Sequence, residues 1–264
     1  MTEQQPFQPL GTPPRPESPP AEPAHGAESR EPVWTYSDLA IFAGLTVPSL
    51  LLGLGLVRAV EFLFRIHPKV RMLELLPAQF LGYALMFTGL MLLLRWQYHR
   101  PFWRSLGWVP LRLPAYAVVL AGLLAAFGVS ATSFLLQTPT TTNPMTEMLE
   151  NPTSLALVAV FGMTLGPLFE ELAFRGFLQP LLARSLGAIP GILLAAIPFG
   201  LLHYQEYGNS WRHVVLISLA GAAFGAMRQL TGSTKASTLM HASYNGLFFV
   251  ALLLQRNQVQ GPHR

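Results

Sequence analysis

The feature that most constrains this chain is a series of separate apolar runs, each close to the length that crosses a membrane. A helix needs about 20 apolar residues to span the hydrocarbon core of a bilayer. Seven such runs lie near residues 38–60, 77–96, 114–137, 153–178, 187–204, 211–230 and 235–254. The sequence therefore predicts an all-α fold, a polytopic bundle of seven transmembrane helices.

Composition supports a membrane environment. Hydrophobic residues make up 51% of the 264 residues and charged residues only 11%, against about 25% charged in soluble domains. The net charge of +4 fits loop arginines beside anionic lipid headgroups. Since no basic stripe with interleaved aromatic residues occurs, we expect contact with membrane lipid and no nucleic-acid partner.

Two segments depart from this pattern. Residues 1–35 are rich in Pro, Glu, Ser and Gln, a composition that predicts a disordered tail. Residues 36–264 would then form the transmembrane domain. Residues 58–74 mix apolar and charged positions, which is typical of an amphipathic surface helix or of an eighth span.

Small residues recur at four-residue spacing inside the apolar runs. The pairs are Gly162 with Gly166, Gly187 with Gly191, and Gly221 with Gly225. In lipid, such pairs let helix backbones approach closely. We expect them at helix contacts within one bundle.

Polar and ionisable groups inside apolar spans are energetically costly and mark functional sites. Beyond the loops and span ends, this chain has few of them. They are Glu170, Glu171, Arg175, His203, His241 and Asn245. These six residues are the candidate site.

Helical spacing separates the two adjacent glutamates. Glu171 and Arg175 are four residues apart with the carboxylate first, the favourable geometry for an ion pair. Glu170 points about 100° away from Glu171 on a helix. One arginine does not easily neutralise two carboxylates, so Glu170 is predicted to face a different neighbour.

Each of the two histidines is also four residues from another candidate residue. His241 and Asn245 share one face of the last run, and Phe199 and His203 share one face of the fifth. Three helices thus each present polar groups on one face, which predicts a common interior site.

Several hydrolase designs are excluded. The only aspartate is Asp38 and cysteine is absent, so neither an aspartyl dyad nor a cysteine nucleophile is possible. The chain has no HExxH and no GxSxG. A peptide bond hydrolysed by this chain would have to be hydrolysed by Glu and His.

Three segments resemble a known family in its motif order. EELAFRG (170–176), FGLLH (199–203) and HASYN (241–245) resemble the EExxxR, FxxxH and HxxxN/B motifs of the CAAX-protease and bacteriocin-processing (CPBP) family. That family includes type II CAAX prenyl endopeptidases and bacterial Abi proteases. The predicted CAAX-protease-like core covers about residues 153–254.

The resemblance implies an intramembrane endopeptidase with a site open toward the cytoplasm. It implies that Glu170 is the general base that deprotonates a water molecule, and that His203 holds this water. The oxyanion would be stabilised by His241 and Asn245. The implied supporting residues are Glu171, Arg175 and Phe199.

Metal dependence stays open from the residues alone. Glu170, His203 and His241 would suit a zinc site with an open fourth position, as in a metalloprotease. The resemblance to CAAX endopeptidases favours a glutamate mechanism without any cofactor.

The substrate is expected to be a protein or peptide, lipidated or not. Ten Lys and Arg residues on the side of the N-terminus, against seven on the other side, favour a cytoplasmic N-terminus. The expected location is the inner membrane of a bacterium, which the Arg-rich, Lys-poor composition permits. The alternative function is a non-enzymatic membrane protein, such as an immunity factor, a scaffold or a proton-coupled carrier.

Overall fold

A computed structural model describes residues 32–139 and 150–259, and all of the elements in these ranges are helices. In chain order they are α1 (Tyr36–Phe64), α2 (Met72–Trp96), α3 (Phe102–Ser105), α4 (Ala115–Leu135), α6 (Pro152–Met163), α7 (Leu165–Glu171), the π-helix η1 (Leu172–Leu178), α8 (Gln179–Leu186), α9 (Ala188–Leu202), α10 (Trp211–Thr231) and α11 (Thr234–Val259). The predicted all-α fold is confirmed, while the proline-rich tail lies almost wholly outside the described residues.

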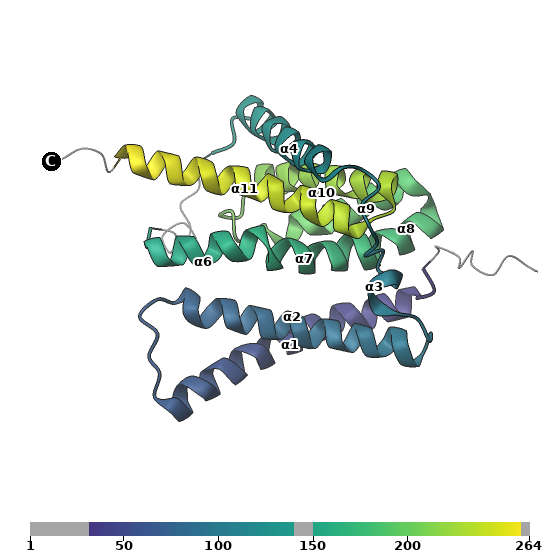
Figure 1. Ribbon diagram of the computed structural model, residues 1–264, viewed down its shortest axis with the longest axis horizontal. Helices are drawn as coiled ribbons and strands as arrows, with labels where there is room; N and C mark the ends of the chain where they lie inside the picture. The colour runs from purple at the N-terminus through teal and green to yellow at the C-terminus, as the bar shows by residue number, and fades with distance from the viewer. Residues whose placement is uncertain (1–31, 140–149, 260–264) are drawn as a thin grey trace, which may run out of the picture. The chain divides into compact units, whose positions relative to one another are not determined.

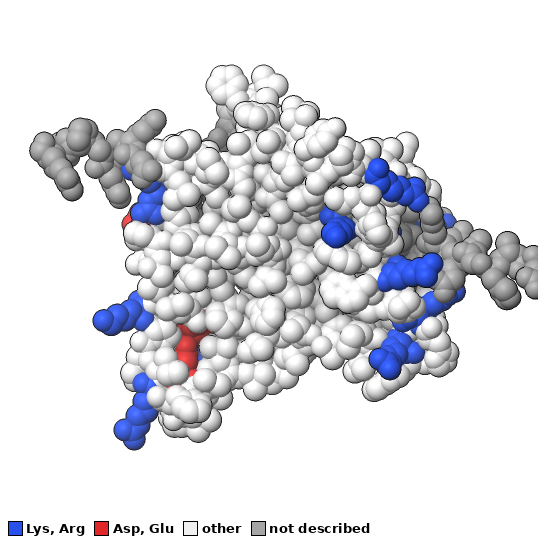
Figure 2. Space-filling model, in the orientation of Figure 1, with Lys and Arg blue, Asp and Glu red and all other residues white. Residues whose placement is uncertain are grey.

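Six helical stretches of the described residues are long and apolar enough to cross a membrane. The remaining predicted run, the fifth, is the shorter helix α9, whose 15 residues extend only about 22 Å. Figure 2 shows the Lys and Arg side chains near two ends of the visible face, with a broad uncharged area between them. These features indicate an integral membrane protein.

Residues 58–74 form no separate helix, so the predicted surface helix or eighth span is wrong. The apolar run of α1 continues to Phe64, and the chain then turns at Arg65, whose φ is 51°. The remaining residues lead into α2 at Met72. A salt bridge of 2.9 Å from Arg58 to Glu74 joins the two helix ends.

The fourth predicted run is an interrupted helix. It breaks at Thr164, whose φ is −131°, because Pro167 has no N–H to donate to the carbonyl four residues earlier. After α7 the backbone widens into η1 and then returns to α-helix in α8. Figure 1 shows α6, α7 and α8 following one another along the bundle. A π-helical turn of this kind often marks a functional site.

The helices that carry the candidate residues pack together. α11 contacts α6, α7 and η1, while α9 and α10 form a close pair that also contacts η1. A side chain at Gly200 would collide with Ser218 and the Val214 carbonyl, so α9 and α10 can approach only because residue 200 is glycine. At the other end of α9, a Cβ at Gly191 would lie 2.7 Å from the backbone of Ala183 in α8, so a small residue also places α9 beside the interrupted helix.

Two ends of the bundle can be defined. The start of α1 lies with α3 and α8, and the α1–α2 connection lies at the opposite end with the last residues of α11 (Figure 1). We call these the Trp34 end and the turn end. At the first, Trp34 is buried, stacks on Phe177 with ring centroids 5.0 Å apart, and donates from Nε1 to the Phe177 carbonyl at 3.0 Å. Arg184 donates to the Trp34 carbonyl at 3.1 Å. This end is closed by packed side chains.

Candidate active site

Glu171 and Arg175 form a buried ion pair at the junction of α7 and η1. Arg175 Nη1 lies 2.9 Å from Glu171 Oε1, and the two side chains are 1% and 0% exposed. Arg175 Nη2 also donates to the Gly221 carbonyl at 2.7 Å, and its guanidinium lies 4.4 Å from the Phe199 ring centroid. A buried pair needs such additional partners to offset its lost hydration. The pair that the spacing predicted is present.

Glycines of α10 make room for these side chains. A Cβ at Gly221 would lie 2.9 Å from the Phe199 ring and 3.0 Å from Arg175 Nη2. One helical turn further, Gln179 Nε2 donates to the Gly225 carbonyl at 2.9 Å. The Gly221–Gly225 pair therefore lies at a helix contact, but there it also exposes two carbonyls to buried donors.

His241 connects the ion pair to the second glutamate. Its Nδ1 lies 3.0 Å from Glu171 Oε1, and because an ionised carboxylate only accepts, Nδ1 carries the hydrogen. The ring is buried and stacks on Phe224 with centroids 4.4 Å apart. Its other nitrogen, Nε2, lies 3.8 Å from Glu170 Oε2. That separation is too long for a direct hydrogen bond.

The two adjacent glutamates have different exposure. The Glu170 side chain is 27% exposed and the Glu171 side chain is fully buried. Glu171 already has Arg175 and His241 as partners. Glu170 is therefore the carboxylate that a substrate or a water molecule can reach.

His203 lies at the end of α9 with a defined hydrogen bond. Its Nδ1 is 2.8 Å from the Phe199 carbonyl, and because a carbonyl only accepts, Nδ1 is the donor. The neutral ring then has an unprotonated Nε2. The Phe199 ring lies near both imidazoles, with centroid distances of 5.1 Å to His203 and 5.8 Å to His241.

Asn245 contacts the break in the fourth span. Its Nδ2 donates to the Gly162 carbonyl at 2.8 Å, just before the break at Thr164. The amide nitrogen has two hydrogens, so one stays available for another acceptor. Asn245 thus joins α11 to the interrupted helix one turn away from His241.

Residues 203–209 form a polar turn that was not among the predicted site residues. The Tyr207 N–H bonds the His203 carbonyl at 3.2 Å, which makes residues 203–207 one helical turn. Glu206 as a whole is exposed, yet burial of its carboxylate is the main cause that raises its pKa. The charge of Glu170 raises this pKa further, and His203 opposes the shift. The spacing of three residues between His203 and Glu206 was the available signal.

Two tyrosines lie near the same carboxylates. The charges of Glu170 and Glu206 act on Tyr83 of α2 and on Tyr207 of the turn. Burial raises the pKa of Tyr207, and the two glutamates raise it further. Tyr83 also packs on Phe169, the residue before Glu170, at a centroid distance of 5.0 Å.

The zinc alternative needs three ligand side chains that converge on one point. Within residues 32–139 and 150–259, no group of three or more His, Asp or Glu side chains could hold a metal ion. The Nδ1 atoms of His203 and His241 bond to Phe199 and Glu171. Both bonds leave Nε2 as the second ring nitrogen, the arrangement that metal-binding histidines also have. The choice between zinc and a mechanism without a metal therefore stays a prediction.

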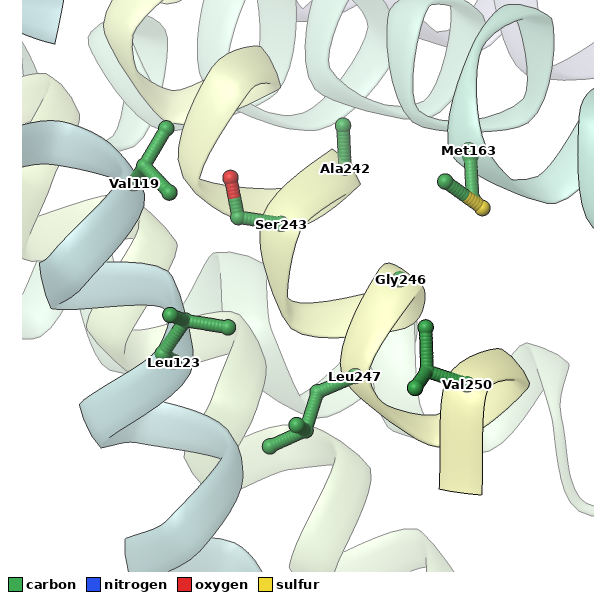
Figure 3. Close-up of a pocket in the computed structure, with 8 residues that line it drawn as sticks. All are labelled: Val119, Leu123, Met163, Ala242, Ser243, Gly246, Leu247 and Val250. Carbon is green, nitrogen blue, oxygen red and sulfur yellow. The ribbon is translucent and has the colours of Figure 1, made fainter. Parts of the chain in front are cut away.

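An apolar pocket of about 370 Å³ lies beside the candidate site, between α4, the end of α6 and α11 (Figure 3). It is lined by Val119, Leu123, Met163, Ala242, Ser243, Gly246, Leu247 and Val250. Ala242 and Gly246 directly follow His241 and Asn245 in the sequence. The pocket could hold an apolar group next to the polar residues.

Comparison with known proteins supports the family resemblance. Residues 152–247 match the family described as type II CAAX prenyl endopeptidase Rce1-like. No curated protein and no solved structure matches the chain. The matched range contains all three motifs and runs from the start of α6 into α11. The match confirms the resemblance predicted from the motifs, and residues 152–247 are thereby identified as similar to CAAX-type intramembrane proteases.

Proposed function

We propose that this protein is an intramembrane endopeptidase that hydrolyses a peptide bond with a water molecule activated by Glu170. One observation carries the proposal. Glu170 is a partly exposed carboxylate, 3.8 Å from the His241 imidazole, in a site where the adjacent Glu171 is already paired with Arg175. A carboxylate placed in this way can accept a proton from water.

His203 supports the same water. Its Nδ1–H is used by the Phe199 carbonyl, so the neutral ring offers Nε2 as an acceptor. A water molecule held between the Glu170 carboxylate and His203 Nε2 would have both hydrogens accepted. Its oxygen would then be oriented toward a substrate carbonyl carbon, which is the condition for attack.

His241 and Asn245 are the proposed donors to the oxyanion. The Nδ1–H of His241 bonds Glu171, so only the imidazolium form has a second N–H to offer. The second amide hydrogen of Asn245 would join it. Each preorganised donor of this kind is worth about 3 kcal/mol in the transition state.

The substrate is proposed to be a membrane-embedded protein or peptide. The apolar pocket along Ala242 and Gly246 supports an apolar side chain or a lipid group bound next to the scissile bond. The mechanism is proposed to use no cofactor.

The site is proposed to open at the turn end and to face the cytoplasm. The Trp34 end is filled by Trp34, Leu106 and Phe177. Gln205 and Glu206 of the polar turn at residues 203–209, in contrast, are exposed. Described Lys and Arg residues divide almost evenly between the ends. At the Trp34 end they are Arg95, Arg100, Arg104, Arg112, Arg184, Arg228 and Lys235, and at the turn end Arg58, Arg65, Lys69, Arg71, Arg212 and Arg256. Because the positive charges are so evenly divided, the positive-inside rule does not fix the orientation of the protein in the membrane.

A site that opens to the cytoplasm at the turn end is incompatible with the expected cytoplasmic N-terminus. With seven crossings, a cytoplasmic N-terminus and a cytoplasmic turn end exclude each other, because α1 begins at the Trp34 end. We therefore propose that the N-terminus of α1 lies on the other side of the membrane.

The test compares the purified full chain with Glu170→Ala on a peptide library in detergent. The Glu170→Ala variant should cleave at least about 10³-fold more slowly than the wild type, because the general base is lost. Glu74→Gln is the control, because it removes a carboxylate outside the site. Equal cleavage by wild type and Glu170→Ala would refute the assignment and favour a non-enzymatic membrane protein.

A further inference from the structure

Peptide hydrolysis requires a proton donor as well as a base. Glu170 can remove a proton from water, but the C–N bond breaks readily only when the departing nitrogen receives a proton. Glu171 and Arg175 are buried in their ion pair, and His241 is already proposed to donate to the oxyanion. The motif residues therefore leave this step to Glu170, once it has taken the proton from water, or to a further acid.

Glu206 has the position for this role. It lies three residues after His203 within one helical turn, closed by the bond from the Tyr207 N–H to the His203 carbonyl at 3.2 Å. Side chains three residues apart on such a turn lie on the same side. The charge of Glu206 interacts with both His203 and Glu170. Glu206 thus lies on the same turn as His203 and within electrostatic range of Glu170, the two groups that would hold the attacking water.

Two tyrosines on different elements are each affected by the charges of both Glu170 and Glu206. Tyr83 on α2 interacts with the charges of both Glu170 and Glu206, and so does Tyr207 on the turn. Tyr207 in turn stacks on His213 of α10 with ring centroids 5.1 Å apart. The two carboxylates therefore share one polar region, on the open side of the site.

We propose that Glu206 is a second catalytic carboxylate, the acid that protonates the leaving amine when the peptide bond is cleaved. This inference rests on the proposed endopeptidase function. It assigns to the polar turn a role that the three motifs do not include.

The step balances with these two carboxylates. Glu170 takes one proton from water while the water oxygen bonds the carbonyl carbon. The tetrahedral intermediate then expels the nitrogen with the electron pair of the C–N bond, and the carboxyl proton of Glu206 is transferred to that nitrogen. The products are a carboxylic acid and an amine. Transfer of the proton from Glu170 to Glu206 restores the starting state.

The environment of Glu206 suits an acid. Its pKa is raised, first by burial of the carboxylate and then by the charge of Glu170, while His203 acts in the opposite sense. Neighbouring carboxylates with different surroundings divide into an acid and a base. A raised pKa keeps Glu206 protonated at a pH where an ordinary glutamate is ionised, so activity should fall as the pH rises through that pKa.

The experiment measures cleavage of two substrates by the full chain in detergent over a range of pH. One is a peptide with an ordinary amide bond, and the other is the same peptide as a nitrophenyl ester, whose leaving group departs without a proton. Wild type, Glu206→Gln, Glu206→Asp and Gln205→Ala are compared. Gln205→Ala is the matched control, because Gln205 is the exposed neighbour on the same turn.

Glu206→Gln should lower kcat for the amide about 100-fold, the usual contribution of an acid, and should leave the ester rate within about twofold. The alkaline fall in the amide profile should disappear in this variant and persist in Glu206→Asp and Gln205→Ala. The proposal is overturned if Glu206→Gln cleaves the amide at the wild-type rate, or if it loses amide and ester cleavage equally. Equal activity of wild type and Glu170→Ala would instead overturn the endopeptidase function itself.

Discussion

Glu170 and Glu171 are adjacent in the chain and differ in almost every contact. Glu171 is fully buried with Arg175 at 2.9 Å and His241 at 3.0 Å, and Glu170 keeps 27% of its side chain exposed. The sequence predicted this division, because two neighbours on a helix point about 100° apart. The identity of the second partner of Glu171 could not be predicted. It comes from α11, 70 residues away, and depends on how the helices pack.

Removal of Arg175 should destabilise the fold. Arg175→Ala leaves Glu171 buried without its cation, at an expected cost of about 3–5 kcal/mol. Thermal unfolding of the full chain in detergent should show a clearly lower midpoint.

The matched variant replaces both charges. Glu171→Gln with Arg175→Met leaves no unpaired buried charge, so its midpoint should recover part of the loss. A midpoint for Arg175→Ala equal to that of the wild type would contradict the description of the pair.

For Asp38, the sequence excluded one catalytic role but did not predict the role that the residue has. As the only aspartate, it could not form an aspartyl dyad. In the structure its Oδ2 accepts from the Thr35 N–H at 2.8 Å and from the Tyr98 hydroxyl at 2.5 Å. It therefore caps the start of α1, which is a structural role away from the site.

At the scale of elements, the interrupted fourth span decides the geometry of the site. Apolar periodicity predicted one continuous helix over residues 153–178. The break at Thr164 and the π-helix after Glu171 arise from Pro167 and from tertiary contacts. The break allows Asn245 to bond the Gly162 carbonyl. The π-helix carries Arg175, so this local change in helix type is part of the site.

The glycine pairs at four-residue spacing predicted helix contacts correctly at some positions and wrongly at others. A Cβ at Gly221, Gly225 or Gly191 would lie within 3.0 Å of a neighbouring helix. At Gly187 no atom lies within 4 Å, and its φ of 91° indicates a turn. Spacing alone could not distinguish a packed glycine from one needed for backbone conformation.

Gly221→Ala is expected to lower activity and stability together. The added methyl group would lie 3.0 Å from Arg175 Nη2 and 2.9 Å from the Phe199 ring, so the buried ion pair must shift. The expected loss of unfolding free energy is about 1–3 kcal/mol, as for other overpacked sites, measured as a lower thermal midpoint in detergent.

Gly44→Ala is the control for this change, because no atom lies within 4 Å of the added methyl group. It should leave the midpoint unchanged or raise it slightly, since alanine favours helix more than glycine does. Equal effects of the two substitutions would show that the contact with Arg175 does not matter.

For the whole molecule, the naturally cysteine-free chain allows a direct test of orientation. Single cysteines at Gln205 and at Lys235 lie in exposed positions at the turn end and the Trp34 end. In intact cells, a membrane-impermeant maleimide should label Lys235→Cys but not Gln205→Cys if the site faces the cytoplasm.

Labelling in detergent gives the matched control, because both cysteines should then react. The reverse pattern in cells would place the site on the outer side. Labelling of both positions in intact cells would contradict the proposed placement of the two ends on opposite sides.

The sequence by itself determined the fold class, the membrane environment and the identity of the chemical groups. In lipid, an apolar run of span length must satisfy its backbone hydrogen bonds within the segment, which a helix does. Ionisable residues inside such a run have a high free-energy cost, so they indicate partners or a function. The tertiary structure decided which residue is the second partner of Glu171 and where Glu206 lies. These facts depend on contacts such as that between Glu171 and His241, between residues far apart in the chain, which no local pattern specifies.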